Sequence, residues 1–566
     1  MPSLAWLRIV WGSQGDCIMN ALEFEYIIVG AGSAGCVLAN RLSAHAHTRV
    51  CLIEAGPVDH TPWIDTPMGI IGLLRGKRYN WYYATAPQEA LGDRKLYWPR
   101  GKTLGGSSSI NAMIYMRGHP SDYDDWAAVG NPGWAWHDVL PVFKQHERQQ
   151  RGGDELHGVD GPLHVSDLAQ PNALSRTFVE AGIQAGLPCC DDFNGRSMEG
   201  VGLYQVTQRE GKRWSAARAF LDPVRHRSNL TVLTDCLTTQ VQIEKRRATG
   251  VRVREGGHER ELRARREVIL CAGAINSPQL LMLSGIGPGR HLQDLAIPVV
   301  YDLPGVGSNL QDHLDVTAIA RERTETAVGV GFGALPRLLQ AFADYRNHGT
   351  GMLASNAAEA GGFARTDARL ARPDVQFHFL PTMLRNHGRK LVWGYGYTLH
   401  VCQLRPQSRG RISLASSDAG VAPRIDPAYL SHPNDLPVLR AGLKLARRIM
   451  ASTAWAPYGT RELEPGPAVQ ADSELDAYIR RNAETIYHPA GTCKMGAGQG
   501  AVVDSFLRVH GIEGLRVADA SIMPVLIGGN TNAPCMMIGE MAGRFIESGT
   551  APSRSVVQPS LVRLVG

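Results

Sequence analysis

A chain of 566 residues exceeds what one hydrophobic core usually supports, so at least two domains are expected. The net charge of +6 is spread over a large surface and no nucleic-acid-reading motif occurs, which argues against nucleic-acid binding. No apolar run reaches the ~18 residues of a membrane span. The ten cysteines show neither zinc-ligand spacing nor a disulfide framework, a pattern typical of a reducing compartment, and no metal site is predicted.

The first residues are expected to lie outside the fold. The apolar segment from Leu4 to Trp11 is short, is interrupted by Arg8 and lacks a clear small-residue cleavage site, so it is a poor signal peptide. Met19 stands just before the first predicted strand. We therefore assign residues 1–20 to an N-terminal extension and expect a cytoplasmic protein, with peripheral contact with the inner membrane left open.

A dinucleotide-binding fingerprint opens the predicted fold. Four β-forming residues lead into Gly30, then Gly32 and Gly35 follow, and helical apolar spacing begins after the third glycine. Such glycines allow a tight turn, close approach of a pyrophosphate, and close packing of helix on strand. A second strand, 50–53, ends in Glu54, about 20 residues after the third glycine, where an acid can bind ribose hydroxyls. The pattern predicts a Rossmann-type cofactor site without a 2′-phosphate.

Four longer motifs decide between a nicotinamide and a flavin cofactor. In chain order they are the glycine-rich segment 101–111 and the segments 273–287, 488–496 and 529–534. Together they resemble the glucose–methanol–choline (GMC) oxidoreductase family, which binds FAD, and the resemblance runs from about residue 23 to about residue 547. Within the family the chain looks most like bacterial FAD-dependent alcohol dehydrogenases acting on primary alcohols.

The resemblance implies an α/β Rossmann-type FAD-binding domain with an inserted α+β substrate-binding domain, an antiparallel sheet flanked by helices. An active site between two such domains can exclude water. The expected parts are FAD-binding 21–151, 223–310 and 501–550, substrate-binding 152–222 and 311–500, and a C-terminal tail at 551–566.

Residue patterns place individual elements in these parts. The basic run 260–266 alternates with Glu and Leu and is predicted to be a solvated strand face. Strands are predicted at 230–233, 241–244, 250–254, 267–270, 375–380, 397–404 and 515–518, and helices at 436–450, 474–482 and 533–546.

The resemblance also assigns residues to the cofactor. The second glycine loop should line the isoalloxazine and pyrophosphate, Asp519 and Ala520 should contact the ribityl–phosphate region, and Thr238 falls where relatives use a backbone contact to adenine. Some relatives attach FAD through a His in the second loop; here that position is Ile110, so non-covalent FAD is expected. The predicted cofactor-binding residues are Gly30, Gly32, Ser33, Ala34, Gly35, Glu54, Ala55, Arg100, Gly105, Gly106, Ser107, Asn111, Ala112, Met113, Thr238, Ala272, Gly273, Asp519, Ala520, Asn532 and Pro534.

His488 and Asn532 are the predicted catalytic residues. His488 matches the family's active-site His, and Pro489 after it disfavours helical geometry there. An imidazole pKa near 6.5 suits proton exchange with an alcohol at neutral pH. Asn532 stands where the family carries His or Asn, and its amide can bind the substrate oxygen; it is also a good N-cap for the helix that begins near Ala533.

The predicted substrate is a small uncharged primary alcohol. Glu359 matches an acid that choline-oxidising relatives use, but Ala357 and Ala358 replace the aromatic residues that a cation needs, so Glu359 is expected to be structural. Apolar Leu353, Phe363 and Met383 are expected to favour aliphatic or aromatic alcohols.

Several alternatives stay open at this point. The enzyme could pass electrons to a quinone or another acceptor as a dehydrogenase, or to O2 as an oxidase of the aryl-alcohol or hydroxymethylfurfural type; choline dehydrogenase, a lyase or light-driven decarboxylase, and a non-catalytic flavoprotein are further readings. The oligomeric state is undetermined.

Overall fold

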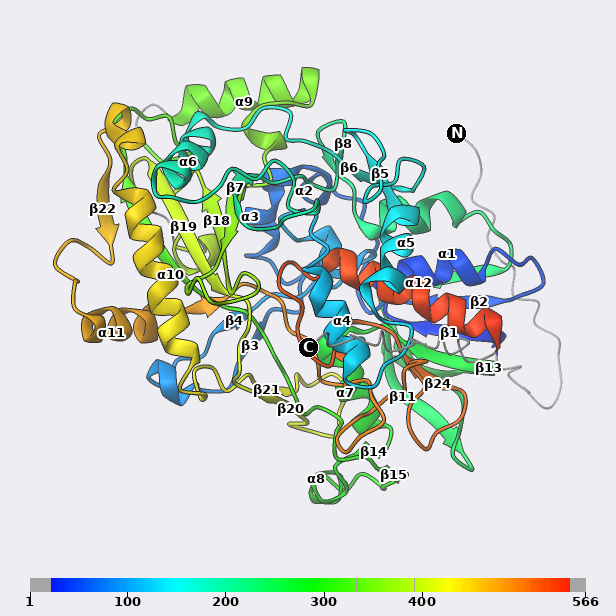
Figure 1. The fold of residues 1–566 in the computed structure, drawn as a ribbon. Helices are drawn as coiled ribbons and strands as arrows, with labels where there is room; N and C mark the ends of the chain where they lie inside the picture. Colours follow the sequence, from blue (N-terminus) through cyan, green and yellow to red (C-terminus); the bar gives the residue numbers. More distant parts are fainter. Residues whose placement is uncertain (1–21, 332–333, 391, 550–566) are drawn as a thin grey trace, which may run out of the picture.

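The computed structural model describes residues 22–331, 334–390 and 392–549 (Figure 1). The predicted N-terminal extension at 1–20 and the tail at 551–566 lie outside the described residues. No helix in the described ranges is both long and apolar enough to cross a bilayer.

A parallel sheet forms around the fingerprint strand. Strand β1 (Leu22–Val29) pairs in parallel with β2 (Val50–Ile53) on one side and with β13 (His258–Leu270) on the other. Strands β10 (Leu230–Leu233) and β24 (Leu515–Val517) extend it, both in parallel. Strand β2 is buried along its whole length, as expected for a strand that is covered on both faces. Three distant parts of the chain thus build one sheet.

An antiparallel meander completes this sheet. Strands β11 (Cys236–Glu244), β12 (Arg247–Glu255) and β13 follow one another and pair in antiparallel fashion. The predicted strand 267–270 is only the end of β13, whose earlier part is the basic run 260–266 with alternating burial. The run therefore has the predicted strand face, but it belongs to one strand of 13 residues.

The second sheet is antiparallel, as expected for the substrate-binding part. Within the described residues seven strands form it. They are, in order, β22 (Arg461–Glu464), β16 (Leu314–Arg321), β19 (Gly396–Gln403), β18 (Val375–Leu380), β17 (Ala360–Ala364) and β7 (Gly200–Leu203), with β23 (Glu484–Thr485) also on β16. Helices α6 (Ala173–Gln184) and α10 (Asp435–Met450) pack on it, and α11 (Asp472–Asn482) packs on α10.

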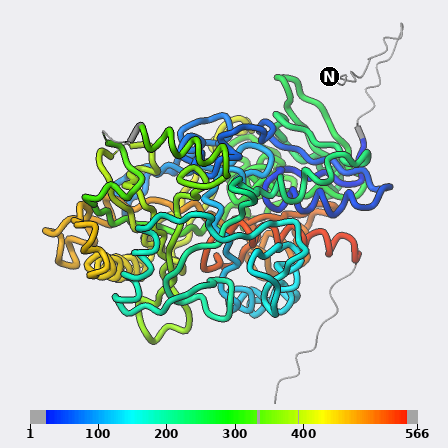
Figure 2. Tube along the Cα trace, turned by 90° about the horizontal axis from the view of Figure 1, so that it is seen from above, coloured from blue at the N-terminus to red at the C-terminus, as the bar shows by residue number. Residues whose placement is uncertain are grey.

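Helix α1 (Ser33–Leu42) packs against α12 (Asn532–Ser548), so the first and last helices lie side by side (Figure 1). Figure 2 shows blue and red segments in one half of the molecule and the yellow and orange helices in the other. The remaining helices are α2 (Pro62–Asp65), α3 (Ile70–Leu73), α4 (Pro120–Ala128), α5 (Trp136–His146), α7 (Gly273–Leu283), α8 (Gly289–Asp294) and α9 (Ala334–His348). The short strands are β3 (Tyr83–Ala84), β4 (Tyr97–Trp98), β5 (Glu147–Gln149), β6 (Leu163–Val165), β8 (Gln208–Arg209), β9 (Lys212–Arg213), β14 (Ile286–Gly287), β15 (Tyr301–Asp302), β20 (Arg411–Ser413) and β21 (Arg424–Asp426).

The adjacent cysteines Cys189 and Cys190 differ in burial. Cys189 is exposed, whereas Cys190 is buried in an apolar cluster with Phe193 and Met198. The cysteines within the described ranges are free thiols.

Candidate active site

One large cavity, with about 2360 Å³ of space that extends to open solvent, is bounded by both sheets. Residues from β1, β2 and α7 line it on the side of the parallel sheet, and His378 and His400 from β18 and β19 line it on the other. The cavity therefore lies where a ligand of the parallel sheet would meet a substrate held by the antiparallel sheet.

Most of the predicted cofactor residues share this cavity. Those that line it are Gly30, Gly32, Ser33, Ala34, Glu54, Ala55, Arg100, Gly106, Ser107, Asn111, Ala112, Met113, Thr238, Ala272, Gly273, Asp519, Ala520 and Asn532. Gly35, Gly105 and Pro534 do not. A Cβ on Gly35 would lie 2.0 Å from the carbonyl oxygen of Gly30, so this glycine is required for packing of α1 on β1. The amide of Gly105 donates to Ala31, and Pro534 is buried in α12.

The start of α1 suits a pyrophosphate. Gly32 is its N-cap, no side chain caps the helix, and its first turn has no acid, so its first N–H groups and the positive helix end face the cavity. Glu54 accepts hydrogen bonds from the amides of Ala31 (3.1 Å) and Gly56 (2.9 Å). Burial raises the pKa of Glu54 to about 7 despite these bonds. The carboxyl group is thereby held rigidly at the end of β2.

The rest of the cavity also fits FAD. Asp519 accepts hydrogen bonds from the Gly273 amide (2.9 Å) and from Ser277 Oγ (2.5 Å), which holds the start of α7 against the end of β24. Thr238 Oγ1 is buried and has no hydrogen-bond partner among the described residues, which is compatible with a ligand at this position. Ile110 is buried beside the cavity and offers no nucleophile for a covalent link.

Backbone contacts fix His488 at the cavity wall. Its amide donates to Asp312 Oδ1 (2.8 Å), and Asp312 also accepts from Thr485 and Tyr429. Burial, followed by the neighbouring His313, His378 and Arg100, lowers the pKa of His488 well below its usual range. The side chain is thus a neutral imidazole at physiological pH. The expected pKa near 6.5 is therefore too high for His488 in its buried position.

The amide beside His488 belongs to Asn530, not to the predicted Asn532. Asn530 Nδ2 lies 3.2 Å from His488 Nε2, whereas Asn532 Oδ1 accepts from Ser33 Oγ (2.7 Å) and so ties α12 to α1. Asn532 is also the first residue of α12, whose N-cap is Thr531. The loop before α12 is held in place because the Gly528 amide donates to Asp122 Oδ2 (2.7 Å).

A directional chain of hydrogen bonds sets the protonation of His488. Tyr204 donates its hydroxyl hydrogen to a backbone carbonyl (2.6 Å), so it accepts from Gln376 Nε2 (3.1 Å), which also donates to Asn530 Oδ1 (3.1 Å). Asn530 must then present Nδ2 to His488, whose Nε2 accepts. The proton of His488 is therefore on Nδ1, where it donates to His313 Nδ1 (3.0 Å). The basic nitrogen of His488, Nε2, thus lies beside Asn530, and both residues line the cavity.

Three further histidines that sequence reasoning did not single out line the cavity: His378, His387 and His400. His378 and His400 are directly paired across β18 and β19. Both ring nitrogens of His378 lack partners within the described structure, and burial lowers its pKa to about 3. His400 Nδ1 lies 2.5 Å from Asp315 Oδ2. His378 and His400 lie in two strands that are almost wholly buried, and a histidine within a largely apolar run such as 375–380 is a signal that could have identified His378.

The residues predicted to set substrate preference lie elsewhere. Glu359 does not line the cavity; it accepts from Ser175 (2.7 Å), Ser355 (2.6 Å) and a backbone amide, as expected for a structural acid. Leu353, Phe363 and Met383 do not line it either. Apolar and aromatic side chains that do line the cavity include Ile70, Ile71, Leu74, Trp81, Ile110, Ile114, Leu380, Leu384, Ile486 and Tyr487.

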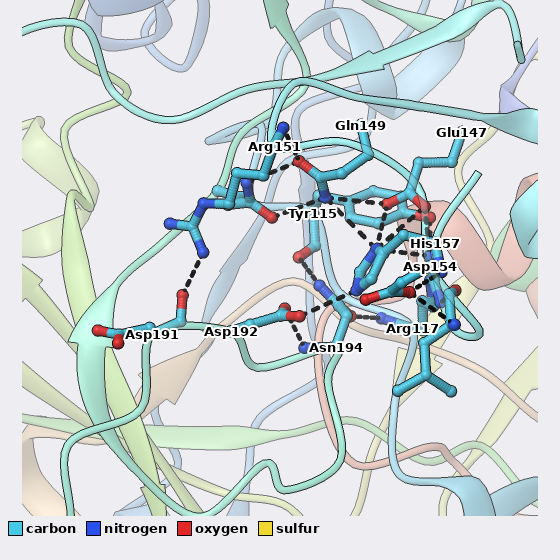
Figure 3. Close-up of polar contacts among 12 residues, drawn as sticks. Tyr115, Arg117, Glu147, Gln149, Arg151, Asp154, His157, Asp191, Asp192 and Asn194 are labelled. Atoms are coloured by element: carbon cyan, nitrogen blue, oxygen red, sulfur yellow. Dashed lines mark hydrogen bonds and ion pairs between the residues drawn. The ribbon is translucent and has the colours of Figure 1, made fainter. Parts of the chain in front are cut away.

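A second buried cluster of charges, outside the cavity, stabilises the chain that follows the second glycine loop (Figure 3). Arg117 Nη2 donates to Glu147 (2.6 Å), and both side chains are fully buried. His157 lies between Glu147 (3.1 Å) and Asp192 (2.9 Å). Burial alone would lower the pKa of His157, but hydrogen bonds to Asp192 and Glu147 outweigh it and raise the pKa to about 9. The cluster is structural.

Comparisons with known proteins agree with this architecture. The profile of GMC oxidoreductases matches residues 24–315 and 406–539. The chain is 52% identical to alcohol dehydrogenase (acceptor) of Pseudomonas putida, over 92% of this chain and 95% of that one. It is 44% identical to mitochondrial choline dehydrogenase of Homo sapiens, over 94% and 90%. The structure of pyridoxine 4-oxidase from Mesorbium loti superposes with a TM-score of 0.84 at 34% identity, over 93% of this chain and 100% of that one. The chain is therefore a member of the GMC oxidoreductase family, with the FAD-binding fold of that family and its action on CH–OH donors.

Proposed function

We infer that this protein oxidises an uncharged primary alcohol to the aldehyde, with His488 as the base. The observation that carries this inference is the position of His488 Nε2, unprotonated and 3.2 Å from the Asn530 amide, in the cavity that the cofactor glycines also line. A buried neutral imidazole with an adjacent amide donor is suited to remove a hydroxyl proton and to hold the oxygen from which it came.

In the proposed reaction the alcohol oxygen lies between His488 and Asn530 and gives its proton to His488. An alcohol oxygen that takes the place of the direct His488–Asn530 contact would donate its proton to Nε2 and accept a hydrogen bond from Asn530 Nδ2. His488 would become charged, and His313, which accepts from His488 Nδ1, would stabilise that charge. Asn530 would stabilise the alkoxide as it forms. Asn532 is proposed to act on the cofactor side, through Ser33, and not on the substrate oxygen.

FAD is proposed to be bound non-covalently. The first turn of α1 would hold the pyrophosphate, Glu54 the ribose, and Gly106, Ser107 and Asn111 the flavin ring. When bound, FAD would supply the two-electron acceptor for the hydride of the alcohol carbon. The α12 N-terminus lies at the cavity, where its positive end would favour negative charge on a bound flavin.

The side chains that line the cavity favour an apolar alcohol over a cationic substrate. Ile and Leu outnumber the aromatic residues Trp81 and Tyr487 among the apolar lining residues named above, and the acid Glu359 is hydrogen-bonded by Ser175 and Ser355 away from the cavity. Relatives are named after both kinds of substrate, alcohol dehydrogenase (acceptor) and choline dehydrogenase. The apolar lining of the cavity favours an uncharged alcohol for this chain. We expect kcat/KM for benzyl alcohol or a medium-chain alkanol to exceed that for choline, and the reverse order would refute the substrate class.

One experiment tests both the reaction and the acceptor. The holoenzyme is mixed anaerobically with an alcohol, flavin bleaching is followed, and air or a quinone is then admitted. Slow recolouring in air that a quinone accelerates supports the dehydrogenase that we propose; fast recolouring in air would instead show an alcohol oxidase. A flavin that no primary alcohol bleaches would refute the proposed function.

We also propose a cytoplasmic location, and we propose the division into FAD-binding and substrate-binding parts that the sequence analysis describes.

A further inference from the structure

Helix α9 (Ala334–His348) presents large apolar side chains to solvent. Leu338, Leu339 and Phe342 are 50%, 65% and 60% exposed. Residues 338 and 342 are one turn apart, and 339 lies beside them, so the three share one face of the helix. Figure 1 shows α9 along the upper edge of the molecule. Isolated exposed apolar residues are common, but three on one face of one helix form a patch that needs an explanation.

An adjacent face of α9 is the one that contacts the rest of the protein. Ala341 is buried, Arg337 lies 5.4 Å from the centre of the Tyr395 ring and pairs with Glu325, and the Tyr345 hydroxyl hydrogen-bonds Thr66. Residues 337, 341 and 345 are spaced by four and so lie along one line of the helix. Small and polar residues therefore attach α9, and its bulky apolar residues face outward. This is the reverse of the usual arrangement in a surface helix.

Two exposed tryptophans extend the apolar surface. Trp63, which is 60% exposed, lies on α2 three residues before Thr66, the partner of α9. Trp393, which is 58% exposed, pairs through its backbone with Val330, a few residues before α9 begins. Tryptophan is enriched where proteins meet the headgroup region of a bilayer. We call Trp63, Val330, Leu338, Leu339, Phe342 and Trp393 the apolar face.

Unpaired cations border the apolar face. Arg346 follows Phe342 by one turn on α9. A second group gathers around Tyr82: Lys77 and Arg389 lie over its ring at 5.5 and 5.3 Å. None of the bordering cations forms an ion pair with a carboxylate in the part of the chain that the structure describes. They are Arg75, Lys77, Arg78, Arg346, Arg389 and Lys390, all exposed.

We propose that the apolar face and its cationic border form a docking surface for an anionic lipid bilayer. Apolar side chains with tryptophans at their edge, bordered by uncompensated positive charge, match the two requirements of peripheral binding: insertion below the headgroups and attraction to anionic lipid. A protein partner with a matching groove would not need so many cations that lack an ion-paired carboxylate, and a second copy of this chain would bring like charges together.

The surface also adjoins the cavity. Helix α9 packs on the turn 352–354, which packs on 67–69, and α3 (Ile70–Leu73) follows directly. Ile70 and Ile71 are half-buried and line the cavity, so this wall reaches the surface next to α9. If the proposed function holds, an apolar alcohol or a lipid-soluble acceptor dissolved in the bilayer would have a short path to the cavity; the docking itself does not depend on turnover.

The test is flotation of the holoenzyme with phosphatidylcholine vesicles, with and without phosphatidylglycerol, at low and high salt. We expect binding to the anionic vesicles, weakened by salt. The double variant Leu338→Glu, Phe342→Glu should lower the partition coefficient by about tenfold or more, since burial of these side chains is lost. A matched control, Val129→Glu with Ile183→Glu, changes two residues that are also exposed, 59% and 46%, but lie on other helices or loops, and it should bind like the parent.

Separate variants test the cationic border. Lys77→Glu with Lys390→Glu should weaken binding to anionic vesicles and leave the weak binding to pure phosphatidylcholine unchanged. Flavin content and thermal unfolding show that each variant is folded. The proposal is overturned if the parent binds anionic vesicles no better than neutral ones, or if the Leu338→Glu, Phe342→Glu variant binds like the parent. It is also overturned if the apolar face instead mediates a dimer, detected by light scattering, that this variant abolishes while vesicles are not bound.

Discussion

Replacement of His488 by alanine tests the proposed base directly. The variant should retain FAD, because none of the phosphate- or ribose-facing groups changes, but anaerobic flavin reduction by an alcohol should slow by about 10²–10⁴-fold, or roughly 2.7–5.4 kcal/mol of transition-state stabilisation. The structure argues against easy replacement of the base. His488 is only 7% exposed, and His313 lies behind it on the Nδ1 side, away from the substrate.

The pH dependence follows from the lowered pKa of His488. Burial and the neighbouring His313, His378 and Arg100 favour the neutral imidazole, so the proton leaves at a pH well below the ordinary 6.5. The parent reduction rate should therefore be flat above about pH 6.5 and decline only in more acidic solution. A rate that still rises between neutral and alkaline pH would contradict the assignment of a neutral base.

Stopped-flow measurement of flavin bleaching at saturating alcohol gives both results. The control is His226→Ala, at an exposed histidine away from the cavity, which should reduce its flavin at the parent rate. The reasoning is refuted if His488→Ala, with full FAD content, bleaches at nearly the rate of this control.

Further predictions concern the neighbouring groups, the cofactor and stability. Asn530→Ala should slow flavin reduction by up to about 10²–10³-fold, whereas Asn532→Ala should mainly loosen FAD; stopped-flow traces and flavin content separate the two, and a reversed pattern would restore Asn532 as the partner. Acid precipitation should release all yellow colour, since Ile110 offers no link; colour in the pellet would exclude non-covalent FAD. The pKa of His157 is raised to about 9, so its stabilising effect is complete below about pH 6.5 and is lost as pH rises through 9. The difference in melting temperature between parent and His157→Gln should therefore shrink over that interval, and a constant difference would count against a charged His157. Deletion of residues 1–18 should leave flavin content and activity unchanged, and loss of FAD would show that they belong to the fold.

Local patterns predicted the cofactor half of the site well. Gly30, Gly32 and Glu54 lie at the cavity because a strand, a tight turn and a helix N-terminus are encoded within a few dozen residues. Strand β18 was predicted with its observed bounds, since its run of β-forming residues is continuous. Where the chemistry depends on neighbouring residues along the chain, sequence alone was enough.

The proposed pairing of His488 with an amide depends on contacts that no local pattern contains. Asn530 and Asn532 differ by only two positions, and long-range contacts hold them: Gly528 donates to Asp122 on α4, Gln376 donates to Asn530, and Ser33 donates to Asn532. The partner of His488 on its other side, His313, precedes it by more than 170 residues.

The protonation state of His488 likewise depends partly on residue type and partly on the tertiary structure. Residue type alone indicates an imidazole that titrates near neutral pH, and the motif identifies which histidine is involved. Its neutral form and the orientation of its basic nitrogen come from burial and from the chain of donors that begins at Tyr204 and passes through Gln376. Sequence thus specifies the fold family and the cofactor loops, and it singles out the histidine that we propose as the base, because these follow from short-range patterns. Desolvation and hydrogen-bond direction arise only when distant strands pack together, so the tertiary structure alone decides the pairing and the charge of the site.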